Sequence, residues 1–315
     1  MKEKRILITG SGGFVGRNLI EHLRRHGYKN LVTVSATDYN LTEQEDVRRM
    51  FKEIRPEIVI NLAAYVGGIL ANKERPADFF YKNIVMGTLV MHEAKEHGVE
   101  KFIALIGGCS YPAHAPSPIK EEDMWEGYPQ PESAPYSLAK KMSIVQAQAY
   151  RQQFGFNAIV LVPGNLYGPH DNFSLKNSHV IPALIRKFYE AKKEGKDEVV
   201  SWGSGKPTRD FIYVGDAVEA IITALEDYNE PDIVNISSGT EVSIKDLVET
   251  IAELTQFKGK VVWDATKPDG QLYKGFAVER MRKKLGFEPK TDLRSGLAKT
   301  IEWFEKNYDK DTVRL

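Results

Sequence analysis

The sequence predicts an α/β protein with a doubly wound parallel sheet and a smaller C-terminal domain. Three observations predict this class. Short runs of almost continuous apolar residues alternate with segments of helical periodicity through the first half of the chain. A cluster of glycines follows the first apolar run. The length of 315 residues, with 42% hydrophobic and 27% charged residues, suits one large α/β domain or two closely packed ones.

The first apolar run, residues 5–10, is expected to form a buried strand, and helical spacing of apolar residues follows it from Phe14 to Leu23. Further strands are expected at 31–36, 57–64, 101–108 and 157–168. The helices between them are expected at 43–54, 78–97 and 134–154. Because crossovers between parallel strands are right-handed, this alternation predicts a sheet with helices on both faces.

The glycine cluster lies between the first strand and the first helix, where Gly10, Gly13 and Gly16 have the spacing G-x-x-G-x-x-G. Glycine allows a tight turn and lets a pyrophosphate approach the backbone at a helix N-terminus. The alternative is an ordinary glycine-rich turn between a strand and a helix. The strand–turn–helix context favours a Rossmann-type dinucleotide site.

The end of the second strand bears on the choice of nicotinamide cofactor. An acidic residue there binds the ribose 2′-hydroxyl, whereas an arginine favours a 2′-phosphate. No Arg or Lys lies in the segment 34–38, and Asp38 either faces a ribose or caps the following turn. We therefore expect NAD rather than NADP.

After residue 165 the alternation loosens. Helices are expected at 180–194, 243–256 and 293–307, and a strand at 232–237. We expect residues 1–165 to form the dinucleotide-binding domain and residues 166–315 to form mainly a substrate domain. Residues 209–237 are expected to return a helix and a strand to the sheet of the first domain.

Composition excludes several classes of function. Basic and acidic residues number 43 each, so the net charge is zero and no nucleic-acid partner is expected. The single cysteine excludes an internal disulfide, and no ligand cluster accompanies His170, so no metal site is expected. No apolar stretch approaches the roughly 18 residues of a spanning helix. The N-terminus has the pattern of a strand, so we expect no membrane association and a cytoplasmic location.

A second motif, Y-x-x-x-K, places Tyr136 and Lys140 on one face of the helix expected at 134–154. An ammonium beside a phenol favours the phenolate, so Lys140 is expected to lower the pKa of Tyr136. Such a tyrosine can move a proton to or from a sugar oxygen while a nicotinamide moves a hydride. The alternative is a surface pair, and the preceding strand–helix units argue against it.

With these motifs in place, the chain resembles the extended short-chain dehydrogenases/reductases that act on nucleotide sugars. Among these it most resembles the GDP-L-fucose synthase family, whose members are GDP-4-keto-6-deoxymannose epimerase/reductases. The resemblance covers nearly the whole chain. It is carried by AAYVGGILANKERPADFFYKN (63–83), CSYP (109–112), APYSLAKK (134–141), NLYGPHDNFSLKNSHVIPAL (165–184), WGSGKPTRDFIYVGD (202–216) and KPDG (267–270).

The resemblance implies roles for individual residues. Those matching the family's catalytic groups are Tyr136, Lys140 and the epimerisation pair Cys109 and His179. Residues that would contact the cofactor are Gly10, Gly13, Phe14, Val15, Gly16, Asp38, Leu62, Ala63, Ala64, Asn83, Tyr136, Lys140, Pro163, Asn165 and Leu166. Residues that would contact a nucleotide-diphosphate sugar, GDP-linked by this resemblance, are Asn165, His179, Val180, Arg186, Lys187, Trp202, Arg209 and Lys274. Trp202 either stacks on a base or fills the core. A homodimer pairing through 78–97 and 134–154 is also implied.

Three departures from the family pattern qualify these roles. Gly107 stands where the family has its catalytic serine, and Ser110, Ser137 or a water is left to replace that hydroxyl. The arginines that hold an NADP 2′-phosphate are absent, with Gly12, Val34 and Ala36 in those neighbourhoods. After the KPDG motif the family usually continues with basic residues and a nearby Asp, whereas residues 271–277 of this chain read QLYKGFA.

Three functions therefore remain open. The first is an epimerase/reductase acting on a GDP-hexose of the 4-keto-6-deoxymannose type. The second is an NAD-dependent GDP-sugar isomerase, an epimerase or ring-form mutase, with no net redox change. The third is a non-catalytic dinucleotide-binding regulator, against which the retained Tyr136, Lys140, Cys109 and His179 argue.

Overall fold

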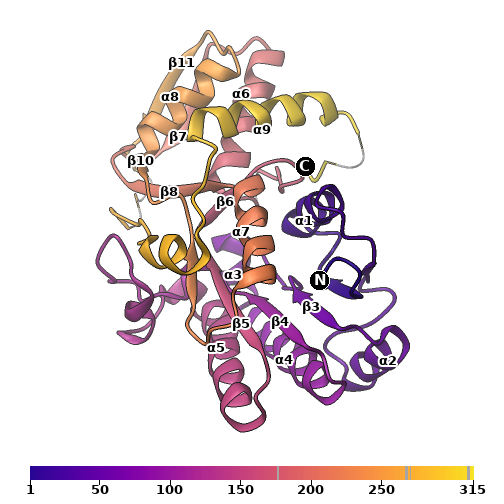
Figure 1. Cartoon of the computed structure of the whole chain (residues 1–315). Helices are drawn as coiled ribbons and strands as arrows, with labels where there is room; N and C mark the ends of the chain where they lie inside the picture. Colours follow the sequence, from indigo (N-terminus) through magenta and orange to yellow (C-terminus); the bar gives the residue numbers. More distant parts are fainter. Residues whose placement is uncertain (176, 267–268, 270, 311–312) are drawn as a thin grey trace.

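The computed structural model describes residues 1–175, 177–266, 269, 271–310 and 313–315. The chain folds into two parts, a large parallel sheet flanked by helices and a smaller α/β part that contains most of the C-terminal third (Figure 1). The KPDG motif at 267–270 lies mainly outside the described residues, since of these four only Asp269 is described.

All six strands of the large sheet run parallel, in the order β2-β1-β3-β4-β5-β9. The chain reverses its direction of winding between β1 and β3, and ligands of such sheets bind outside the carboxyl ends of the strands at this switch point. The predicted fold class is confirmed. The strands are β1 (Ile6–Thr9), β2 (Leu31–Thr33), β3 (Ile58–Asn61), β4 (Lys101–Leu105), β5 (Ala158–Pro163) and β9 (Val234–Ile236).

Helices cover both faces of this sheet because successive strand residues point to opposite sides. Ile6 and Ile8 of β1 belong to a core with α1 (Phe14–Arg25) and α7 (Val214–Asp227). Leu7 belongs to a second core on the other face, with the helices α2 (Gln44–Ile54), α4 (Pro76–Glu96) and α5 (Ala134–Phe154). The continuous apolar character of the strands follows from this burial on two faces.

The strands of the large sheet are shorter in the structure than the apolar runs suggested. The run 157–168 is two strands, because Gly164 separates β5 from β6 (Asn165–Tyr167), which joins a different sheet. A Cβ at Gly164 would collide with the Ser237 hydroxyl, so the chain bends at this close approach. The segments after Thr33 and after Leu105 turn out of the sheet and form the loops of the site described below.

The smaller part has its own core between three helices, α6 (Val180–Lys193), α8 (Ile244–Leu254) and α9 (Leu293–Asn307). Its strands form the sheets β10-β8-β6 and β11-β7, with β7 (Glu198–Trp202), β8 (Thr208–Tyr213), β10 (Glu241–Ser243) and β11 (Lys260–Asp264). Helix α7 and strand β9 lie with the large sheet. The division of the chain at residue 165 stays a prediction.

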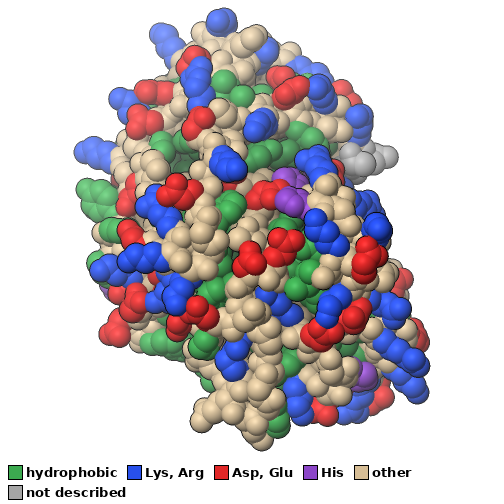
Figure 2. All heavy atoms as spheres, in the orientation of Figure 1, with side chains coloured by type: hydrophobic (Ala, Val, Ile, Leu, Met, Phe, Trp, Pro, Cys, Tyr) green, Lys and Arg blue, Asp and Glu red, His purple; other side chains and the backbone are tan. Residues whose placement is uncertain are grey.

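Acidic and basic side chains are interspersed over the face shown in Figure 2, as the balanced composition leads one to expect. A search of the described helices found none that combines the length and the apolar character needed to cross a bilayer.

Candidate active site

The glycine turn after β1 is packed so closely that the spacing of its glycines has a direct steric cause. Gly10 has φ +65°, and a Cβ there would lie 2.7 Å from the carbonyl carbon of Leu62. A Cβ at Gly16 would lie 2.5 Å from the carbonyl oxygen of Gly10. Helix α1 begins at Phe14 with Gly13 as an N-cap that has no side-chain hydrogen bond. Its first N–H groups therefore remain available to an anion such as a pyrophosphate.

The segment after β3 lies against the glycine turn, since a Cβ at Gly10 would touch the backbone of Leu62 and Ala63. The Thr9 hydroxyl donates to Asn61 (2.6 Å) and accepts from the backbone N–H of Ala63 (3.2 Å), which ties this segment to β1. Asn83 uses its side-chain amide to brace the backbone of Tyr65, giving and accepting hydrogen bonds of 2.9 Å. Among the predicted cofactor residues near the glycine turn, Gly16, Asn83 and Pro163 are buried and Asp38 is exposed. The others are partly exposed: Gly10, Gly13, Phe14, Val15, Leu62, Ala63, Ala64, Asn165 and Leu166.

Asp38 closes the turn after β2. Its carboxylate accepts hydrogen bonds from the backbone N–H (2.9 Å) and the hydroxyl (2.7 Å) of Ser35, and these lower the pKa of Asp38 below its ordinary 3.8. The sequence suggested no cation near this strand end, but the fold places one there. Arg49 of α2 donates to the Asp38 carbonyl (2.9 Å) and lies 4.5 Å from the Tyr39 ring centroid. A shallow hollow beside β2 is lined by these three residues.

The predicted catalytic groups gather where β4 ends. A single 3-10 turn, Gly108–Ser110, follows β4 and presents Cys109 beside the first turns of α5. A Cβ at Gly107 would lie 3.1 Å from Cys109 Sγ and 3.9 Å from Tyr136 Cε1, so these three positions adjoin. Cys109 interacts electrostatically with both Tyr136 and Lys140. The edge of the Tyr136 ring packs on Phe79, with centroids 6.3 Å apart.

The expected effect of Lys140 on Tyr136 is wrong for this structure. Burial, reinforced by the charge of Cys109, raises the pKa of Tyr136 above its ordinary 10, and burial lowers the pKa of Lys140 to about 8. Desolvation by the surrounding protein is the largest cause of both shifts, and it disfavours the charged form of each group. Tyr136 is therefore a neutral phenol near pH 7, which equips it to donate a proton.

His179 is the N-cap residue of α6, and its side chain reaches solvent. The preceding residues, 177 and 178, pack on Gly68, and Gly67 in turn lies against Phe79. His179 thus belongs to the wall that borders Tyr136 through Phe79. Surrounding protein atoms lower the pKa of His179 below 6.5, so its ring is neutral near pH 7. Among the described residues, no hydrogen bond or charge interaction joins it to Cys109.

Neither nearby serine replaces the missing hydroxyl at Gly107. Ser110 is fully buried and its hydroxyl donates to the Ser137 carbonyl (3.2 Å). The hydroxyl of Ser137 is also fully buried. Ser110 therefore supports the join between the 3-10 turn and α5, whereas the Ser137 hydroxyl has no hydrogen-bond partner among the described residues. Neither hydroxyl is exposed to solvent.

The residues predicted to hold the sugar nucleotide are spread over the smaller part of the molecule. Arg186 pairs with Glu190 (2.7 Å), whereas Lys187 donates to the Val200 carbonyl at the edge of β7. Arg209 on β8 donates to the Gln271 carbonyl (2.7 Å). The remaining candidates differ in exposure, since Val180 and Trp202 are exposed while Asn165 and Lys274 are half-buried. An exposed Trp202, at 65%, argues for stacking rather than for a core role.

Sequence reasoning missed two residues that build this site. Asp210 is fully buried and its carboxylate accepts from the backbone of Ser238 (3.1 Å) and Gly239 (3.0 Å). The ring of Phe276 occupies the space beside Gly108, where a Cβ would lie 2.5 Å from its Cζ. Residues 107–108 and residues 271–277 both depart from the family pattern. Because these two segments are in contact, their joint departure was the sequence signal that could have pointed to Phe276.

A glycine turn at the switch point of a parallel sheet, next to an enclosed Tyr–Lys pair, defines a dinucleotide-dependent enzyme of the short-chain dehydrogenase/reductase type. The profile of the NAD dependent epimerase/dehydratase family matches residues 6–237. GDP-L-fucose synthase 1 of Arabidopsis thaliana is 44% identical over 306 residues, covering 97% of this chain and 94% of the relative.

Two solved structures extend the comparison. A GDP-L-fucose synthetase from Naegleria fowleri bound to NADP has a TM-score of 0.92 at 28% identity, covering 100% of this chain and 97% of the other. A GDP-6-OMe-4-keto-L-xylo-heptose reductase from C. jejuni has a TM-score of 0.90 at 28% identity, covering 97% and 99%. The chain belongs to the NAD-dependent epimerase/dehydratase family, and the resemblance to nucleotide-sugar enzymes of the GDP-L-fucose synthase type is confirmed.

Proposed function

We propose that this protein epimerises and reduces a GDP-linked 4-keto-6-deoxyhexose, as a GDP-L-fucose synthase. The observation that carries the proposal is the cluster at the end of β4. Tyr136, Lys140 and Cys109 adjoin one another, and none of their polar ends has a hydrogen-bond partner among the described residues. Enclosed polar groups are normally paired, so an unpaired set in a crevice is suited to a ligand.

The chemistry of a 4-keto sugar matches these groups. The ketone acidifies the hydrogens at C3 and C5, and inversion needs a base on one face and an acid on the other. Cys109, in the 3-10 turn after β4, and His179, at the N-terminus of α6, come from different segments and would exchange these protons. The bound nicotinamide supplies the hydride for C4. Tyr136, as a neutral phenol, would then protonate the C4 oxygen, and Lys140 would hold that phenol in place.

We propose NAD as the preferred cofactor. The positions that carry arginine in the NADP-binding pattern hold Gly12 and Ala36, and both are exposed and uncharged. Asp38 places a carboxylate at the end of β2, which repels a 2′-phosphate and suits a 2′-hydroxyl. Arg49 is the one nearby cation that could favour the 2′-phosphate of NADP. However, its guanidinium already donates to the Asp38 carbonyl and to the Asp46 carboxylate (2.9 Å each).

One incubation tests the function. The protein is mixed with GDP-4-keto-6-deoxymannose in heavy water, in parallel with NADH and with NADPH, and the product is read by mass spectrometry and NMR. We expect a reduced product carrying deuterium at C3 and C5, formed with a kcat/KM at least about tenfold higher for NADH. Deuterium uptake without reduction would replace this proposal by an isomerase without net redox. An absence of both would contradict the substrate assignment.

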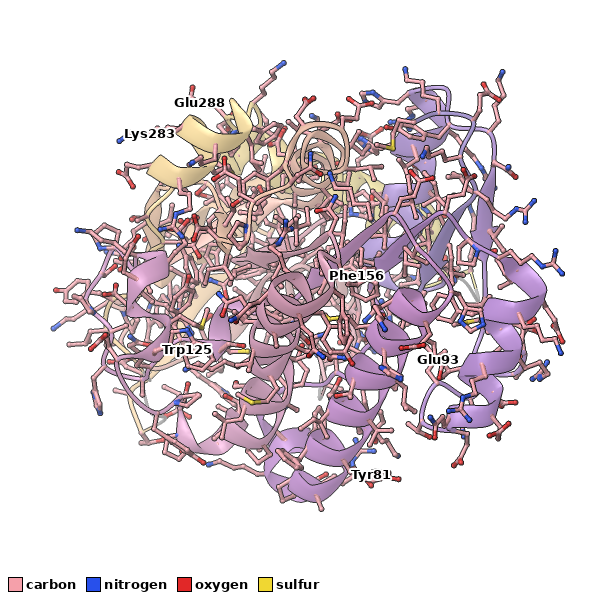
Figure 3. The ribbon with its side chains drawn as sticks, turned by 60° about the horizontal axis from the view of Figure 1, so that its bottom comes forward. Tyr81, Glu93, Trp125, Phe156, Lys283 and Glu288 are labelled. Atoms are coloured by element: carbon pink, nitrogen blue, oxygen red, sulfur yellow. The ribbon has the colours of Figure 1, made fainter. Side chains whose placement is uncertain are left out.

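A homodimer is proposed through α4 and α5, which pack side by side. Their outer surface carries large apolar side chains, with Phe80 43%, Tyr81 59% and Val145 46% exposed. Figure 3 shows Tyr81 directed outward from α4. A second copy would cover this apolar face with its own equivalent helices, as the resemblance implies.

Sedimentation measurements test this assembly. The native chain is expected to sediment at twice its 35.6 kDa. Val145→Glu is expected to shift it toward the monomer, because a charge would be buried in the contact. Val262→Glu, at an apolar position of similar exposure on β11, is the matched control and should leave the dimer intact. A native protein that sediments as a monomer would contradict the proposal.

A further inference from the structure

The chain that leaves the Cys109 turn is tied to a buried asparagine on β9, the edge strand of the large sheet. Tyr111, two residues after Cys109, is buried, and its hydroxyl donates to the side-chain oxygen of Asn235 (2.6 Å). Burial raises the pKa of Tyr111, so its phenol remains a hydrogen-bond donor at every pH at which the protein works. The turn therefore has a fixed point directly after the thiol.

Asn235 also holds two further segments of the chain. Its side-chain amide donates to the carbonyls of Ile119 and Ala277 (3.1 Å each). Its backbone N–H donates to the buried carboxylate of Glu121 (3.0 Å). The two segments are also paired with each other, because Ile119 donates to the Gly275 carbonyl (2.9 Å) and accepts from the N–H of Ala277 (2.8 Å). Asn235 thus joins this short backbone pairing to the sheet and to Tyr111.

The pairing places an aromatic ring against the other side of the same turn. Phe276 belongs to the paired segment, and a Cβ at Gly108 would lie 2.5 Å from its Cζ. The rings of Phe276 and Tyr111 are neighbours, with centroids 6.0 Å apart. The 3-10 turn is therefore supported on both sides of Cys109, by Phe276 before it and by the Tyr111 hydroxyl after it. Asn235 bonds to both of these supports or to the residue beside them.

We propose that Asn235 is a positioning residue that, through Tyr111 and the paired segment, holds the Sγ of Cys109 in place for proton transfer to and from the sugar. The inference rests on the proposed function. Proton transfer needs the two heavy atoms at hydrogen-bond distance, and a misplacement of about 1 Å can cost about 10²-fold in rate. Two glycines precede Cys109, and glycine restricts the backbone least, so the turn has little stiffness of its own. The buried network supplies that stiffness.

The test combines catalysis with the reactivity of one thiol. Cys109 is the single cysteine of the chain, so cysteine alkylation by iodoacetamide, read by mass spectrometry, reports on this turn alone. Tyr111→Phe keeps the ring and removes one hydrogen bond. We expect it to lower kcat for deuterium exchange at C3 and C5 of GDP-4-keto-6-deoxymannose by about tenfold or more, with KM changed by less than about threefold. Alkylation should become about threefold faster or more, because a loosened turn opens more often.

Tyr28→Phe is the matched control. Tyr28 is as buried as Tyr111 and its hydroxyl donates to Glu226 (2.7 Å), but it lies in the core on the other face of the sheet. That variant should keep the native rates of exchange and alkylation, even where its unfolding temperature falls as far as that of Tyr111→Phe. Asn235→Ala, which removes three side-chain hydrogen bonds, should change both rates in the same direction as Tyr111→Phe and further.

Two results overturn the inference. If Tyr111→Phe exchanges deuterium and is alkylated within about threefold of the native rates, the thiol does not depend on this network. If Tyr28→Phe loses exchange to the same extent as Tyr111→Phe, the effect belongs to overall stability and not to the position of Cys109. A native protein that exchanges no deuterium, while Tyr111→Phe still speeds alkylation, would overturn the proposed function and leave the support of the turn by Asn235 standing.

Discussion

Tyr136→Phe is expected to slow reduction of the 4-keto sugar by about 10²–10⁴-fold, the range for loss of a positioned general acid. The hydroxyl of Tyr136 has no hydrogen-bond partner among the described residues, and it is held neutral because burial and Cys109 raise its pKa. Phenylalanine keeps the ring and its contact with Phe79, so the crevice should keep its shape. The loss should therefore fall on kcat and leave GDP binding unchanged.

The measurement is the oxidation of the reduced nicotinamide in single turnovers with the 4-keto sugar. Tyr150→Phe is the matched control, because Tyr150 lies on the same helix α5 and its hydroxyl contacts His92 (2.8 Å) away from the site. That variant should reduce the substrate at the native rate. A Tyr136→Phe protein within about tenfold of the native rate would remove the tyrosine from the reaction.

Cys109→Ala is expected to lower deuterium incorporation at C3 and C5 by about 10²–10⁴-fold, because one of the two proton-transfer groups is removed. Reduction of a substrate that needs no epimerisation should continue, since Tyr136 and Lys140 are untouched. This selective loss separates the two half-reactions. Ser110→Ala, one residue further along the same 3-10 turn, is the control, because Ser110 is buried and should not contact the sugar.

His179→Gln should lower deuterium exchange at C3 and C5 as Cys109→Ala does. It should also change how the exchange rate depends on pH. The pKa of His179 is lowered below 6.5 by desolvation from the protein atoms around its ring, so the neutral ring accepts a proton near pH 7. In the native protein, exchange should fall as the pH decreases below 6.5 and the ring becomes protonated. If this acid limb persists unchanged in His179→Gln, the histidine is not the group that titrates.

The parts of the fold that repeat a local pattern were predictable. The six-stranded sheet follows from apolar runs that alternate with helices, and α5, from Ala134 to Phe154, has its predicted bounds. The strand predicted at 157–168 was wrong in its extent, because an apolar run does not show that Gly164 must bend against Ser237. Ends of elements depend on such contacts between distant segments, which local patterns do not carry.

The candidate site also has parts that the sequence predicted and parts that it did not. The Gly10–Gly16 turn and the Tyr136–Lys140 spacing are local, and their positions followed from the motifs. The electrostatic state of Tyr136 did not, because the spacing suggests a lowered pKa while enclosure by protein raises it. The cation beside Asp38 was also missed, since Arg49 reaches it from a different helix.

The sequence by itself determined the class of fold and predicted the dinucleotide turn and the Tyr136–Lys140 pair, because each is encoded by residues close together in the chain. Only the tertiary structure decided that Ser110 and Ser137 are buried and that Phe276 packs on Gly108. Residues 107–110 and 274–276 are far apart in sequence and meet because β8 anchors the later segment through Asp210. Desolvation and contact between distant segments are properties of the packed chain, and they set the chemistry available at this crevice.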